Sequence, residues 1–142
     1  MAKTTVLFLC TGNSARSQMA EGLLRELGGE GFDVESAGTA PAGLNSLATE
    51  VMREIGIDIS GQQSKSVADF LGKRFDHVIT VCDRARESCP IFPGAAQMLH
   101  WSFDDPAAAP GNEVERQSVF RRVRDQIRHR IEEWLQTQRA AP

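Results

Sequence analysis

The sequence has 142 residues, of which 41% are hydrophobic and 25% are charged, and its formal net charge is −3. This length and composition suit one domain, which we expect to span residues 1–142 as a monomer by default. The acidic balance excludes the basic surface of a nucleic-acid-binding protein, and no apolar run approaches the roughly 20 residues that cross a membrane. The apolar run at 6–9 is too short for a signal peptide, so we expect a cytoplasmic protein with reduced thiols.

Hydrophobic periodicity predicts strands that alternate with helices along the whole chain. The apolar run at 5–9 is typical of a buried parallel strand, and helical spacing at 17–27, ended by Gly28, predicts the first helix. The other expected elements are a strand at 32–36, helices at 44–55 and 67–71, strands at 76–81 and 95–100, a terminal helix at 113–138 and a frayed tail at 139–142. This alternation indicates an α/β fold, a parallel sheet with helices on both faces.

The residues from Cys10 to Ser17 connect the first strand to the first helix, at the sheet edge where ligands bind in such folds. A short loop there can turn its N–H groups toward an anion, and the following helix offers its positive end. Arg16 can bind two oxygens of a tetrahedral oxyanion with its guanidinium. The same environment lowers the pKa of thiols to roughly 3.5–7.5, so Cys10 is a candidate nucleophile, with Ser17 as a hydrogen-bond donor to its thiolate.

The oxyanion-binding residues that we expect are Thr11, Gly12, Asn13, Ser14, Ala15, Arg16 and Ser17. One alternative is a buried cysteine that ends a strand before an ordinary loop. A nucleotide-binding P-loop is disfavoured, because the loop does not end in Gly-Lys-Ser/Thr.

Two further cysteines extend this candidate site. Cys82 follows the third expected strand, so it should lie at the same sheet edge as Cys10, and Cys89 comes seven residues later. Arg84 and Arg86 would favour thiolates in this segment. The alternative is that Cys82 belongs to the core and Cys89 has no role, since buried cysteines are common.

Metal ligands are sparse in this sequence. Three thiols at these spacings lack the fourth ligand of a zinc site. Each histidine is expected to be structural or solvated rather than a ligand: His77, His100 and His129.

Motifs over nearly the whole chain resemble those of the low-molecular-weight protein tyrosine phosphatases and, within that family, the thioredoxin-coupled arsenate reductases. The motifs are VLFLCTGNSARSQMAEG at 6–22, SAGT at 36–39, GIDIS at 56–60, VITVCD at 78–83, Cys89, and FDDP at 103–106. The resemblance implies a single domain with a four-stranded parallel sheet flanked by helices. It also implies an enzyme that reduces arsenate to arsenite, with no tightly bound cofactor.

The resemblance implies a role for each site residue. Cys10 would be the nucleophile and Arg16 the oxyanion clamp, and Asp105 would be the acid that protonates the departing oxygen. Asp104 is the alternative acid. A disulfide would then pass from Cys10–Cys82 to Cys82–Cys89, and thioredoxin would reduce it.

Some relatives bind a potassium ion behind the loop. Here such a site would use Asn13, Glu21 and Ser36. Gln63 and Lys65 stand where some of those relatives have threonine and aspartate, and the Lys65 ammonium could take the place of the cation.

The main competing function is a low-molecular-weight phosphatase, which would need Cys10, Arg16 and Asp105 but neither of the other cysteines. The chain has no tyrosine, and alanines at 107–109 follow the acid, so the rim expected for an aromatic phosphoester is missing. A non-enzymatic oxyanion sensor is a further alternative, but it would not need an acid. Glutathione with glutaredoxin, or mycothiol, are alternative electron donors to thioredoxin.

Overall fold

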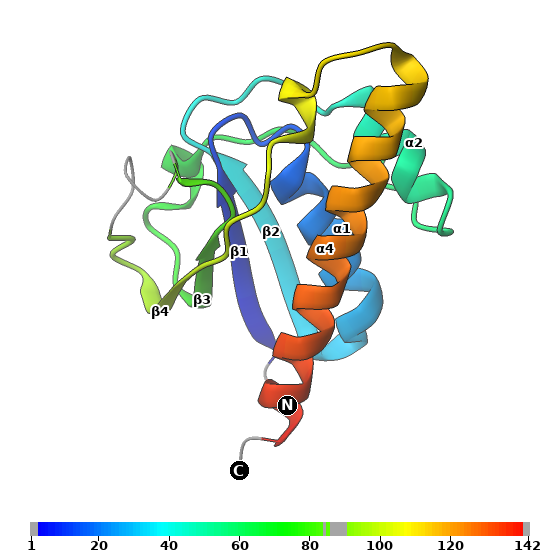
Figure 1. Cartoon of the computed structure of the whole chain (residues 1–142). Coiled ribbons are helices and arrows are strands. Elements are labelled where there is room, and N and C mark those ends of the chain that lie inside the picture. The colour runs from blue at the N-terminus through cyan, green and yellow to red at the C-terminus, as the bar shows by residue number, and fades with distance from the viewer. Residues whose placement is uncertain (1–2, 84, 86–90, 141–142) are drawn as a thin grey trace.

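The computed structural model describes residues 3–83, 85 and 91–140. Four parallel strands form the sheet in the order β2-β1-β3-β4 (Figure 1). Their bounds are β1 Thr4–Cys10, β2 Phe32–Gly38, β3 Phe75–Thr80 and β4 Ala95–His100. The α/β fold with a four-stranded parallel sheet, expected from the sequence, is therefore confirmed.

The α-helices whose bounds lie within the described residues are α1 Arg16–Gly28, α2 Ser46–Arg53 and α4 Glu113–Ala140. Short 3-10 helices are η1 Gly29–Gly31, η2 Val67–Phe70 and η3 Pro106–Ala108. Helix α2 begins later than predicted, because the Asn45 side chain caps it by accepting the Ala48 N–H at 3.0 Å. The prediction of a frayed tail from 139 is wrong up to Ala140, which is still helical; residues 141–142 lie outside the described residues.

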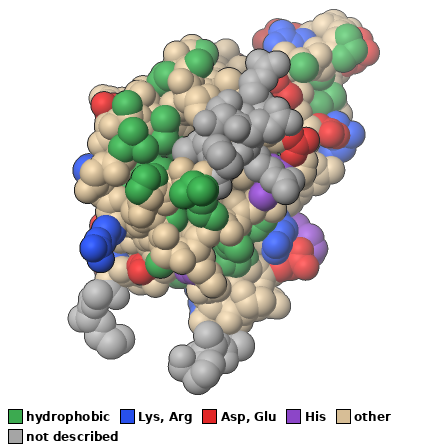
Figure 2. Space-filling model, turned by 90° about the vertical axis from the view of Figure 1, so that its left-hand side faces the viewer, with side chains coloured by type: hydrophobic (Ala, Val, Ile, Leu, Met, Phe, Trp, Pro, Cys, Tyr) green, Lys and Arg blue, Asp and Glu red, His purple; other side chains and the backbone are tan. Residues whose placement is uncertain are grey.

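The two faces of the sheet are covered unequally, with α1, α2 and α4 all on one side (Figure 1). Because successive side chains of a strand point to opposite faces, β1 contributes Val6 and Phe8 to the core under these helices, and Leu7 and Leu9 to the other face. That second core is smaller and includes Phe70 from η2. Figure 2 views the side that carries β3 and β4, where hydrophobic side chains reach the surface.

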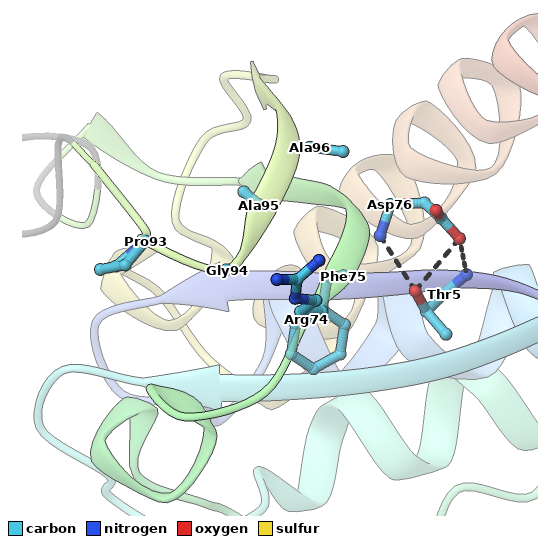
Figure 3. A pocket seen from close by; sticks show the side chains of 8 residues that line it. All are labelled: Thr5, Arg74, Phe75, Asp76, Pro93, Gly94, Ala95 and Ala96. Carbon is cyan, nitrogen blue, oxygen red and sulfur yellow. Dashed lines mark hydrogen bonds between the residues drawn. The ribbon is translucent and has the colours of Figure 1, made fainter.

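The amino edge of the sheet has a hollow of about 420 Å³ between β1, β3 and β4 (Figure 3). The Thr5 N–H and hydroxyl donate to the Asp76 carboxylate at 2.8 and 3.2 Å, and the Asp76 N–H donates to the Thr5 hydroxyl at 2.9 Å. These bonds join β1 to β3 at the amino edge of the sheet. They help to keep the two strands in register, so that both strands end at the same carboxyl edge. No helix in the described part of the chain is long and apolar enough to cross a membrane.

Candidate active site

The carboxyl edge of the sheet carries a cavity of about 540 Å³. It is lined by Cys10, Thr11, Gly12, Ser14, Ala15, Arg16, Ala42, Cys82, Asp83, Asp105 and Ala107. Three separate segments thus bring together the expected nucleophile and clamp, the second thiol and the acid. Cys89 lies outside the described residues, as do Arg84 and Arg86.

The loop carbonyls are bonded away from this cavity. The N–H groups of Thr39, Ala40, Ala42 and Asn45 donate to the carbonyls of Cys10, Thr11, Gly12 and Ser14 at 3.3, 2.8, 2.8 and 3.0 Å. The Gln18 side chain donates to the fifth carbonyl, that of Asn13, at 2.9 Å. Because these carbonyls are hydrogen-bonded to residues outside the loop, the N–H groups of the loop are available to bind an anion. No pattern in the sequence indicated this function of the segment at 39–45.

Asn13 holds the loop in a conformation that few residues adopt. It is fully buried and has φ 46°, a left-handed value that asparagine tolerates better than most residues. Its amide donates to the hydroxyls of Ser17 and Ser36, each at 2.9 Å, and its Oδ1 accepts the Lys65 N–H at 2.8 Å. These bonds fix the loop shape before any anion binds.

Gly38 lets the loop pack onto the end of β2. A Cβ atom there would lie 2.5 Å from the Thr11 carbonyl oxygen and 2.9 Å from the Asn13 nitrogen, both of them backbone atoms. Neither atom can move away as a flexible side chain would, so a side chain at this position would displace the loop.

Cys10 and Cys82 are both free thiols, buried, and close enough to share a hydrogen bond. That bond is the largest cause that lowers the pKa of Cys82 to about 5, and the Thr11 hydroxyl and the Ala85 N–H lower it further. The same contact, with burial, raises the pKa of Cys10, although Arg16 opposes the change. The two thiols therefore titrate as a coupled pair that shares one proton.

The expectation of a low pKa for Cys10 is wrong in this arrangement. The sequence places Arg16 and the loop near Cys10, and both lower its pKa as expected, but the second thiol outweighs them. No hydrogen bond from Ser17 to Cys10 is found among the described residues. The Ser17 hydroxyl accepts the Asn13 amide at 2.9 Å and thereby supports the loop, and its own proton remains available to donate.

Arg16 joins the loop to the segment that carries the acid. Its guanidinium donates to the Phe103 carbonyl at 3.1 Å and lies 3.7 Å from the Asp105 carboxylate. Asp105 has the extended backbone expected before a proline, and it lines the cavity. Asp104 is not among the cavity's lining residues and lies 3.6 Å from Arg122. The geometry therefore favours Asp105 as the acid.

The residues behind the loop do not fit a potassium ion. Glu21, whose side chain is only 3% exposed, accepts the Ser36 hydroxyl at 2.6 Å and an Arg25 hydrogen bond at 2.7 Å. The Lys65 ammonium lies 3.5 Å from the same carboxylate. Two cations already neutralise Glu21, so its charge cannot attract a third.

None of the three histidines belongs to a cluster of described residues that could bind a metal ion. His77 is buried edge-on against Trp134, His129 lies 3.4 Å from Glu133 on α4, and His100 contacts Thr80 and Asp83. Within residues 3–83, 85 and 91–140, no cluster of three His, Cys, Asp or Glu side chains could hold a metal ion.

Comparison with known proteins agrees with this geometry. An arsenate reductase from Halalkalibacterium halodurans is 47% identical over 137 residues, which cover 96% of this chain and 99% of that protein. A solved arsenate reductase in a phosphate-binding state has a TM-score of 0.81 and 34% identity, covering 94% of this chain and 98% of that one. A thioredoxin-dependent arsenate reductase from Corynebacterium glutamicum has a TM-score of 0.73 and 29% identity, covering 96% of this chain and 62% of that one.

The model of the family described as low molecular weight phosphotyrosine protein phosphatase matches residues 5–141. The loop, the acid and the sheet edge described above lie within that match. The chain therefore belongs to the low molecular weight phosphotyrosine protein phosphatase family, as a relative of its arsenate reductases.

Proposed function

We propose that this protein reduces arsenate to arsenite through a relay of Cys10, Cys82 and Cys89, and that thioredoxin restores the thiols. The observation that carries the proposal is that Cys10 and Cys82, both buried free thiols, line one cavity beside the oxyanion loop. Hydrolysis of a phosphoester needs one thiol, whereas reduction needs a second thiol within reach of the first. The arsenate reductases among its relatives, one of them thioredoxin-dependent, support this substrate and this donor.

In this proposal the three cysteines act one after another. A proton passed to Cys82 across the shared hydrogen bond leaves Cys10 as the thiolate that attacks arsenic. The As–O bond breaks, and Asp105 protonates the departing oxygen. Cys82 then releases its proton to solvent and attacks the Cys10 sulfur as a thiolate; the S–As bond breaks, and its electron pair stays on arsenic, which leaves as arsenite. Finally Cys89 attacks Cys82, which frees Cys10, and a dithiol donor reduces the Cys82–Cys89 disulfide.

The experiment that tests this function is arsenate-dependent oxidation of NADPH with two donor systems. Thioredoxin with its reductase should support turnover, and glutathione with glutaredoxin should not. Turnover only with glutathione and glutaredoxin, or only with mycothiol, would contradict the thioredoxin assignment, and no turnover with any donor would contradict arsenate reduction itself.

We further propose that the enzyme acts as a monomer in the cytoplasm, where thiols stay reduced.

A phosphatase side activity is the second function that an observation favours. Cys10, Arg16 and Asp105 line one cavity and are the residues that phosphoester hydrolysis would use. The chain has no tyrosine to form an aromatic rim, so a small phosphoester such as p-nitrophenyl phosphate should be a slow substrate.

Arg16→Ala should weaken the binding of arsenate, phosphate and sulfate alike. Hydrogen bonds to a charged group contribute about 1.5–3 kcal/mol, so we expect a loss of roughly 10- to 150-fold for each anion. Thermal shifts measured against anion concentration would give these affinities. Arg122→Ala is the matched control, because Arg122 pairs with Asp104 outside the lining of the cavity. Equal stabilisation of wild type and Arg16→Ala by the anions would contradict the clamp.

Potassium should not activate or stabilise this enzyme, because Lys65 supplies the positive charge at Glu21 and also lies 2.9 Å from Glu35. We expect the same kcat/KM and the same free energy of unfolding in potassium and in sodium chloride. Lys65→Ala should lower the free energy of unfolding by about 1–3 kcal/mol, since it removes a partner of a buried carboxylate.

Urea unfolding would measure this change. Lys73→Ala is the control, because the Lys73 ammonium lies over the Phe70 ring rather than beside a buried acid. A wild-type enzyme that potassium stabilises more than sodium does would show that the cation site is intact.

A further inference from the structure

A chain of three hydrogen-bonded side chains lies beside Cys82. The Thr80 hydroxyl and the His100 Nδ1 atom are 2.7 Å apart, and the His100 Nε2 atom is 2.8 Å from a carboxylate oxygen of Asp83. The Ser102 hydroxyl donates to the same oxygen of Asp83 at 3.4 Å. None of these residues is needed for the thiol or acid steps described above.

The Thr80 end of this hydrogen-bonded series is fixed by the sheet. Thr80 and His100 are the last residues of β3 and β4 and pair directly in the register of the sheet. Thr80 is buried, whereas the Asp83 side chain is 73% exposed. The carboxylate can only accept, so Nε2 donates to Asp83. The Thr80 hydroxyl lies between His100 Nδ1 and the Leu99 carbonyl, to which it donates at 3.4 Å. The imidazole is therefore held on the sheet and reaches outward to Asp83.

The Asp83 end of this hydrogen-bonded series constrains the position of Cys82. The backbone is tied to neighbouring strands up to residue 81, by Val81 N–H to the Leu9 carbonyl at 2.9 Å. Asp83 is the residue after Cys82 and lines the same cavity. Fixing the side chain of Asp83 to β4 therefore constrains the Cys82 backbone from its C-terminal side, as Val81 does from its N-terminal side.

We propose that His100 is a positioning residue, which holds Asp83 and thereby aims the Cys82 sulfur at Cys10. The inference rests on the proposed function, because the direction of Cys82 matters only when it attacks Cys10. Phosphoester hydrolysis uses Cys10, Arg16 and Asp105 and is independent of this constraint. An exposed ion pair contributes little to global stability, so variants of His100 and Asp83 should remain folded.

The test compares two substitutions at His100. In His100→Asn the amide can still reach Thr80 but is too short to reach Asp83, whereas His100→Gln keeps an N–H near the position of Nε2. The matched control is His129→Asn, which removes the imidazole beside Glu133 on the surface of α4. A second variant, Thr80→Val, removes the buried anchor but keeps the shape of the side chain.

Two rates are measured for each variant. The first is arsenite release in a single turnover at saturating arsenate without thioredoxin, and the second is hydrolysis of p-nitrophenyl phosphate. We expect His100→Asn and Thr80→Val to slow arsenite release roughly tenfold, with the arsenate concentration for half-saturation unchanged. His100→Gln should restore most of the rate. Phosphatase activity should stay within about twofold of wild type in every variant, and His129→Asn should change neither rate.

Four other outcomes would overturn the inference. Unchanged arsenite release in His100→Asn would show that Asp83 does not position Cys82. A parallel loss of both activities, or a failure of His100→Gln to restore the rate, would show a structural role for the histidine. If the wild-type enzyme released no arsenite with any donor, the proposed function and this inference would both be wrong.

Discussion

Cys10→Ser should abolish arsenate reduction and phosphoester hydrolysis together, leaving both at the background of an enzyme-free reaction. Both reactions begin with attack of the Cys10 thiolate on a tetrahedral centre, and a serine hydroxyl at this place has no base to activate it. NADPH oxidation with thioredoxin and hydrolysis of p-nitrophenyl phosphate measure the two rates.

Anion binding provides the control for this variant. The loop N–H groups and Arg16 do not depend on the sulfur, so arsenate should still raise the melting temperature of Cys10→Ser. A stabilised but inactive variant would assign the loss to chemistry rather than to misfolding. Turnover above background in either assay would show that another group is the nucleophile.

Cys82→Ser should abolish arsenate reduction but keep phosphatase activity. Cys82 is the largest cause of the raised pKa of Cys10, so its replacement removes a thiolate that competes for the proton. The pKa of Cys10 should then fall, and the fraction of Cys10 thiolate near neutral pH should rise. We therefore expect phosphatase activity equal to or above that of wild type, with the acid limb of its pH profile moved to lower pH.

Cys89→Ser is the companion variant for this prediction. It should also stop multiple turnovers, yet it should release up to one arsenite per enzyme, because Cys10 and Cys82 can still form their disulfide. Cys82→Ser should release none. If Cys82→Ser lost both activities while its melting temperature stayed near that of wild type, Cys82 would support the loop rather than carry electrons.

Local patterns were enough to predict most of the fold. The apolar run before Cys10 and the alternation of strands with helices depend on burial and spacing, which act along the chain. The predicted bounds were wrong at two helix ends. Asn45 caps α2, which therefore begins later than predicted, and α4 continues to Ala140. Both differences concern boundaries, which propensity alone determines weakly.

The site could be predicted in its residues but not in its electrostatics. Cys10, Arg16, Cys82 and Asp105 were identified from motifs, and the structure brings them to one cavity. The proton shared by Cys10 and Cys82 depends on a distance between segments 72 residues apart in sequence, which no local pattern contains. The double neutralisation of Glu21 has the same origin, since it needs contacts from both α1 and residue 65.

The bonds around the oxyanion loop also determine when in folding the loop can exist. Four of its carbonyls are held by the segment at 39–45, and its asparagine is held in part by Ser36 and Lys65, all of them distant in sequence. A peptide with only β1, the loop and α1 would lack every one of these partners, and its backbone would sample many shapes instead of one. The entropy of ordering the loop is therefore lost when β2 and the following segment dock, not when the anion arrives. The eight-residue motif is for this reason not a transferable anion receptor, because its affinity is a property of the completed sheet.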